Sequence, residues 1–238
     1  MSIKNDFAKA LSKVFTYKRT QNILRKVITV SNALHIHKFE IDEIPDIPCV
    51  LANNHGFEIN GISLDMLVIW PACQRKIIGV FYERLFEDKK YEPCKIFLEK
   101  WGAISTKQLK NVQKRTKNDE IVGIDPEGAR CRLKQEGYYG AVWIAELLDY
   151  PIQPIRITSK KGYFRGFLGG YTRLEVLPNI GLPKMGFPEE IPGIDIQKVT
   201  REYKRNLLER KTCELMTAFN NSLQYKQHIE LACLKLRI

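Results

Sequence analysis

The stretch CVLANNHGFEIN, residues 49–60, changes abruptly from apolar to polar, and this change gives the first indication of the fold. Its opening residues form a short apolar run that is typical of a buried strand. A histidine followed by glycine comes shortly after this run, where an open α/β sheet would place a pocket. A neutral imidazole can take a proton from a hydroxyl near physiological pH, so His55 is a candidate general base. Taken alone, a histidine in such a turn is more often structural.

A second strand-and-turn pattern follows in residues 121–132, IVGIDPEGARCR. The apolar run again reads as a buried strand, and the polar turn begins directly after it. Gly128 could let the backbone approach a ligand closely. Arg130 and Arg132 could clamp a phosphate, because guanidinium presents a fork of donors to its oxygens. Glu127 could orient an arginine or a substrate hydroxyl, although an ordinary solvated turn with a surface salt bridge would show the same residues.

The rest of the chain alternates between predicted strands and helices. Apolar runs predict strands at residues 76–80, 152–157 and 174–177, and helical periodicity predicts helices at 141–148 and 195–223. This alternation favours an α/β fold with a central, mostly parallel or mixed sheet flanked by helices. The proline- and glycine-rich residues 178–194 predict an irregular surface loop. A chain of 238 residues is long enough for one sizeable core and short for two independent domains.

Residues 1–40 predict a basic amphipathic helical pair that precedes the α/β domain of residues 41–238. Apolar residues recur there at spacings of three and four, with a break near residues 17–20. Such helices could dock in a membrane interface with their cations toward anionic headgroups. The apolar stripe could equally pack on the protein's own core. A single acid, Asp6, accompanies the basic residues of the first 38 positions, which are Lys4, Lys9, Lys13, Lys18, Arg19, Arg25, Lys26 and Lys38.

The net charge of +11 indicates an anionic partner, which could be nucleic acid, a membrane surface or a phosphorylated substrate. Nucleic acid is disfavoured, because the aromatic residues do not interleave with basic ones in any RNP-like or zinc-finger pattern. The six cysteines include no CxxC pair, so we expect neither a zinc site nor a disulfide framework, but free thiols in a reducing compartment. No apolar run approaches the ~18–20 residues that span a bilayer.

Four short sequence motifs, which occur in a fixed order along the chain, give the most specific indication of function. They are Asn54-His55…Asn60, Gly102-Ala103-Ile104, Asp125-Pro126-Glu127-Gly128-Ala129-Arg130 and Tyr150-Pro151-Ile152-Gln153-Pro154. In order and spacing they resemble the NHxxxxD, Gly-Ala-Ile, FPEGTR and VPIVPV blocks of the glycerolipid (lysophosphatidate) acyltransferase family. The resemblance covers roughly residues 48–180.

The resemblance implies an O-acyltransferase of phospholipid synthesis or remodelling. It would move a fatty acyl group from acyl-CoA or acyl-carrier protein to a hydroxyl of a lysophospholipid such as lysophosphatidate. The resemblance makes His55 the general base and Arg130 the phosphate ligand, with Glu127 and Gly128 shaping the turn. No metal and no cofactor beyond the thioester donor is implied. We expect a peripheral protein at an anionic membrane surface, on the cytoplasmic face.

Position 60 departs from the family pattern, because Asn60 stands where the family has the aspartate that holds the imidazole. Asparagine cannot stabilise an imidazolium with a negative charge, and the corresponding change in the serine-protease triad costs about four orders of magnitude in rate. Glu58 could replace this carboxylate and ranks first because it is nearer His55 in sequence. Asp65 could instead reach back from the following helix. The remaining hypothesis is a weak or inactive acyltransferase-like protein that binds lipid or membranes.

Overall fold

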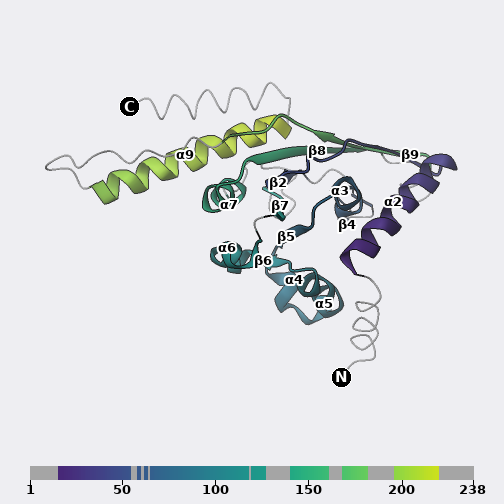
Figure 1. The fold of residues 1–238 in the computed structure, drawn as a ribbon, viewed down its shortest axis with the longest axis horizontal. Helices are drawn as coiled ribbons and strands as arrows, with labels where there is room; N and C mark the ends of the chain where they lie inside the picture. Colours follow the sequence, from purple (N-terminus) through teal and green to yellow (C-terminus); the bar gives the residue numbers. More distant parts are fainter. Residues whose placement is uncertain are drawn as a thin grey trace.

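A computed structural model of the chain describes residues 16–54, 58–59, 62–63, 65–117, 119–126, 140–160, 168–181 and 196–219. These residues form one seven-stranded mixed sheet in the order β1-β9-β8-β2-β7-β5-β6, and a small hairpin (Figure 1). Strands β8, β2, β7, β5 and β6 are parallel, β9 runs antiparallel to β8, and β1 pairs in parallel with β9. The strands are β1 (His37–Ile41), β2 (Val50–Asn53), β5 (Ile77–Phe81), β6 (Ile104–Ser105), β7 (Ile121–Ile124), β8 (Ile152–Lys160) and β9 (Gly170–Val176), and the hairpin consists of β3 (Glu58–Ile59) and β4 (Ile62–Ser63).

Helices cover both faces of this sheet, which confirms the predicted α/β class. On one face lie α7 (Gly140–Leu148), α9 (Ile196–Phe219) and α6 (Val112–Arg115), the last preceded by the 3-10 helix η2 (Thr106–Asn111). The other face carries α2 (Tyr17–Ala33) and α3 (Met66–Ala72). Between β5 and β6 the chain forms α4 (Arg84–Glu87), η1 (Lys89–Tyr91) and α5 (Glu92–Lys100), which lie near the β6 edge in Figure 1.

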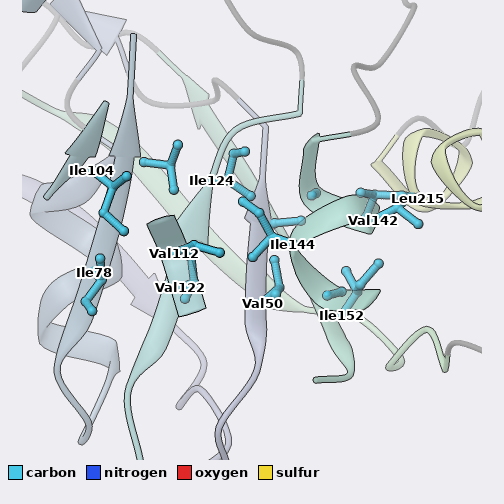
Figure 2. Close-up of a cluster of buried hydrophobic side chains, with 14 of the residues drawn as sticks. Val50, Ile78, Ile104, Val112, Val122, Ile124, Val142, Ile144, Ile152 and Leu215 are labelled. Carbon is cyan, nitrogen blue, oxygen red and sulfur yellow. The ribbon is translucent and has the colours of Figure 1, made fainter. Parts of the chain in front are cut away.

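The central strands are apolar without interruption because each of their faces packs against helices. In β2, Val50 and Ala52 join the cluster beneath α7 and α9, whereas the intervening Leu51 joins the cluster beneath α3. Ile78 and Ile77 of β5 divide in the same way between the two clusters. Successive side chains of a strand point to opposite faces, so a strand buried on both faces shows no polar alternation. Figure 2 shows the first cluster, in which Leu215 of α9 meets Val142 of α7.

The predicted elements agree with the structure most closely in the centre of the sheet. Strand β7 coincides with the apolar run that predicted a strand at residues 121–124, and β2 and β5 each lie one residue further along the chain than the strands predicted at 49–52 and 76–80. Strand β9 begins at Gly170 rather than at the predicted residue 174. The prediction missed its first half because buried side chains alternate there with more exposed ones, so there is no continuous apolar run. The described part of the C-terminal helix, α9, agrees with the predicted helical pattern.

Helix α2 presents its polar side to the protein and much of its apolar side to solvent. Gln21 and Arg25 donate hydrogen bonds to main-chain carbonyls at the end of α3. Residues recurring every three or four positions form an outward apolar stripe, with exposed fractions of 44% for Ile23, 52% for Val27, 53% for Val30 and 64% for Leu34. We call these four residues the apolar stripe.

Thr16 is the N-cap of α2, so this helix begins at the predicted break between the two N-terminal helices. The first helix of the predicted pair lies outside the described residues. Residue 40, the expected boundary between the docking segment and the α/β domain, falls inside β1. Among the helices that the structure describes, no helix combines the length and the hydropathy required to cross a bilayer.

Candidate functional site

The polar turns after β2 and β7 begin side by side at one edge of the sheet. The two strands are parallel neighbours, with Ala52 paired to Ile124. The chain segments that follow this pair, Asn53–Asn54 and Asp125–Pro126, therefore begin about one strand spacing, ~4.8 Å, apart. Ligands of open α/β sheets bind outside the carboxyl ends of the strands. Two sequence blocks separated by some seventy residues thus converge where a site is expected.

The side chain of Asn54 fixes the start of the first turn. Its amide oxygen accepts a hydrogen bond of 2.7 Å from the Ile157 main-chain N–H, and its amide nitrogen donates one of 3.0 Å to the Ile157 carbonyl. These bonds extend the β2–β8 pairing, whose last residue pair is Asn53 and Ile155. Asn54 immediately precedes His55, so the bonds anchor the chain next to the candidate base. The sequence marks Asn54 only as part of a block and does not reveal this role, because nothing in it points to Ile157 as the partner.

Asn53 places a buried acceptor at the same point. The residue is only 3% exposed, and its side-chain oxygen has no hydrogen-bond partner among the described residues. Its amide nitrogen donates to the neighbouring Asn54 carbonyl at 3.3 Å. Buried polar atoms without partners are uncommon in folded proteins. A hydroxyl or imidazole N–H of a bound group could satisfy this oxygen.

Of the two carboxylate candidates, Asp65 is the one whose side chain the structure describes. The hairpin pairs Glu58 with Ser63 and so returns the chain toward its origin, just before Asp65 and α3. Asp65 is 3% exposed, and its side chain makes no capping hydrogen bond to the first turn of α3. Glu58 belongs to β3, but its side chain lies outside the described part.

The other predicted site residues remain predictions. His55 and Asn60 lie outside the described residues, and so do the phosphate-turn residues Glu127, Gly128, Arg130 and Arg132. Two family-like blocks are described in full. Gly102 turns the chain into β6 with a φ of 84°, which favours glycine, and the proline-rich block at residues 150–154 begins β8 beside β2.

The buried thiols of the described core are poor nucleophiles. Burial raises the pKa of the Cys49 thiol to about 12 and raises the pKa of Cys73 as well. Both thiols are therefore protonated at neutral pH, and the thiolate is the reactive form. Cys49 and Cys73 are free cysteines, and no group of three or more potential metal ligands occurs within the part of the chain that the structure describes.

No protein-family model matches the chain, and no curated protein does so either. A solved structure is similar over most of the chain. It is the crystal structure of the 1-acyl-sn-glycerophosphate (LPA) acyltransferase PlsC from Thermotoga maritima, with a TM-score of 0.50 and 15% sequence identity. The similarity covers 88% of this chain and 87% of the PlsC chain. At this identity the likeness establishes a shared α/β fold.

Proposed function

We propose that this protein is an acyltransferase that transfers a fatty acyl group from a thioester to a hydroxyl of a lysophospholipid at a membrane surface. The observation that carries the proposal is that β2 and β7 are parallel neighbours, so that Asn54 and Asp125, the first residues of the Asn54-His55 and Asp125–Arg130 blocks, lie at the same end of the sheet. The fold shared with a lysophosphatidate acyltransferase supports it independently of the residues.

In the proposed reaction, His55 removes the proton from the acceptor hydroxyl, and the oxygen attacks the thioester carbonyl. The bond from the carbonyl carbon to sulfur then breaks, and the thiolate of coenzyme A or of the carrier protein takes the proton from the imidazolium. Arg130 and Arg132 hold the acceptor phosphate through paired N–H donors. Glu127 and Gly128 shape that turn. Every step uses groups of this chain and its two substrates.

Asp65 is the carboxylate that best fits the role of the family's missing aspartate. It is buried, and a charge removed from water interacts more strongly with an imidazolium than an exposed one does. The β3–β4 hairpin also pairs Glu58 with Ser63, so the chain has turned back on itself just before Asp65. This proposal reverses the sequence-based ranking, which put Glu58 first.

The apolar stripe of α2 supports docking on a membrane. Of the apolar residues in α2, Leu24 and Ile28 are half-buried, whereas the stripe faces outward and borders an apolar hollow of about 350 Å³. Lys26 lines this hollow, and Arg19 is also exposed. An apolar face bordered by cations suits the interface of an anionic membrane. The acceptor's acyl chain would already be located there.

The proposal is tested by supplying lysophosphatidate vesicles with acyl-CoA, and separately with acyl-carrier protein, and measuring diacyl product by mass spectrometry. We expect His55→Ala to abolish turnover. Asp65→Asn should lower kcat by up to about 10⁴-fold, as loss of the orienting carboxylate does in a triad. Glu58→Gln should stay near wild type and serves as the matched control. Circular dichroism of each variant separates loss of chemistry from loss of folding.

Full turnover by His55→Ala would refute the acyltransferase mechanism. Asn60 motivates a second candidate, a lipid-binding protein without turnover. That candidate would be supported if wild-type protein bound vesicles but acylated no acceptor across a panel of lysophospholipids with either donor.

A further inference from the structure

A cationic groove of about 670 Å³ lies at the β6 edge of the sheet, away from the two polar turns. Its walls come from α4 and α5 on one side and from η2 and α6 on the other. Four cationic side chains and two carboxylates line it, namely Lys76, Lys95, Lys107 and Arg115 with Glu87 and Glu99. Ligand pockets in proteins are typically about 300–1,000 Å³, so the groove has the size of a small-molecule site.

The sequence around the groove carries a large share of the positive charge of the protein. Residues 84–117 contain ten lysines and arginines but only four aspartates and glutamates, a surplus of six within a net charge of +11. The groove lining itself has four cations against two carboxylates, a surplus of two positive charges, and a concave surface with such a surplus concentrates ligands of the opposite sign. Phosphorylated small molecules are therefore the class of ligand that this groove favours.

Acidic neighbours hold the lysines in place while leaving some of their N–H groups available. Lys107 pairs with Glu87 at 2.7 Å, and Lys76 pairs with Glu120 at 2.8 Å. An ammonium group has three donors, so each lysine retains donors for a ligand. The hydrogen bond that Lys107 donates to the Glu87 carboxylate raises the pKa of Lys107, which stays charged at neutral pH. Arg115 is exposed and makes no ion pair within the described part of the chain.

The groove also has apolar side chains in its lining and free space at Gly102, which has no side chain. Phe86 and Ile78 line it beside the cations, and a planar base can stack on an aromatic ring. At Gly102, a side chain would begin 3.4 Å from the Lys76 ammonium nitrogen, so the glycine leaves room above this cation. Cations together with an apolar wall fit a phosphorylated nucleotide better than they fit a bare phosphate.

We propose that this groove binds the phosphorylated nucleotide of a coenzyme A thioester. The inference rests on the proposed function and identifies the donor class. Three strand spacings, about 14 Å, separate β6 from β2 across the sheet, and the long arm of coenzyme A can cover this span. The groove lining includes Ser105, the last residue of β6, and also Lys107 and Phe86, which follow β6 and β5 along the chain. The thioester end can therefore extend from the groove, past the carboxyl ends of β5 and β7, toward the polar turn that begins after β2.

Isothermal titration calorimetry of the full chain with free coenzyme A, and separately with inorganic phosphate, tests the proposal. The groove variant is Lys95→Gln/Arg115→Gln. Its matched control is Arg205→Gln/Arg210→Gln, which removes the same charge from exposed positions of α9. Two lost phosphate contacts should raise the Kd for coenzyme A about tenfold or more in the groove variant. The control should change it less than about threefold, because distant exposed charges are screened by salt.

Equal weakening in the two variants would overturn the proposal, because only net charge would then matter. So would equal affinity of the wild type for coenzyme A and inorganic phosphate, or the absence of coenzyme A binding. The proposed function is judged separately by turnover. Turnover with acyl-carrier protein but no coenzyme A binding would reject the groove and keep the acyltransferase. Coenzyme A binding without turnover on any acceptor would do the reverse.

Discussion

At the residue scale, Asn54 substitutes for a peptide group at the end of β2 by bonding to the N–H and the carbonyl of Ile157. We predict that Asn54→Ala lowers kcat about tenfold or more with little change in KM, because small misplacements of a catalytic group are costly. Loss of two hydrogen bonds should also lower the free energy of unfolding by about 1–3 kcal/mol. Steady-state kinetics and urea unfolding measure the two effects.

The chain contains a matched control for this prediction. Asn32 makes the same pair of bonds to the main chain of Phe39, at 2.7 and 2.9 Å, in the α2–β1 connection. Asn32→Ala should reduce stability by a similar amount and leave kcat near wild type. A kcat that falls equally in the two variants would show that general destabilisation accounts for the loss.

Sequence alone could nominate the carboxylates near His55 but could not rank them. Separation along the chain favoured Glu58, since it lies three residues from the histidine. Our proposal puts Asp65 first instead, because the hairpin that pairs Glu58 with Ser63 brings the chain back before Asp65. Burial of Asp65 depends on α3 and its packing, which are tertiary features. Local spacing was therefore insufficient for the geometry of this site.

At the element scale, the hydrogen bonds that α2 donates to the end of α3 should contribute measurably to the free energy of unfolding. The Gln21 amide donates hydrogen bonds of 2.8 Å to the Trp70 carbonyl and 2.6 Å to the Cys73 carbonyl. Gln21→Ala removes one hydrogen bond from each of these carbonyls, and leaves the Cys73 carbonyl with Arg25 and the Trp70 carbonyl with the Cys73 N–H as donors. We predict a loss of about 1–3 kcal/mol in urea unfolding.

Asn22 is the neighbouring, exposed residue of α2, so Asn22→Ala is the control. It should change the free energy of unfolding by no more than about 0.5 kcal/mol. Identical urea midpoints for the two variants would mean that α2 contributes little to the stability of α3.

The strands whose bounds were predicted best from the sequence are those buried on both faces of the sheet. Strand β7 could be bounded to the residue because its apolar run begins and ends abruptly. The two edge strands were not predicted. β6 has only two residues, and β1, with the sequence HKFEI, alternates polar and apolar side chains within a stretch assigned to helices. Their strand character comes from pairing with β5 and β9, which sequence periodicity does not reveal.

At the scale of the whole molecule, two of the surfaces that the structure describes combine cations with apolar side chains. One is the groove beside β6, and the other is the outward side of α2, where Arg19 and Lys26 accompany the apolar stripe. A single net charge of +11 did not distinguish a membrane from a phosphorylated substrate, because the proposed function uses one surface for each. The two surfaces can be separated experimentally, since only the stripe is apolar enough to insert into lipid.

The apolar stripe of α2 should contribute directly to the binding of the protein to vesicles. Val27→Ser/Val30→Ser removes apolar surface from two half-exposed positions without changing the charge. Burial of a valine side chain contributes about 1.5–3 kcal/mol, so we expect binding to vesicles of phosphatidylcholine and phosphatidylglycerol to weaken about tenfold or more. Asn22→Ser/Thr29→Ser changes exposed positions of α2 outside the stripe and should leave binding near wild type. Vesicle sedimentation measures the binding of both double variants.

Binding should also weaken without phosphatidylglycerol or at high salt, because cations flank the stripe. Equal binding by the two double variants would show that α2 does not insert, and docking would then have to be sought elsewhere in the chain.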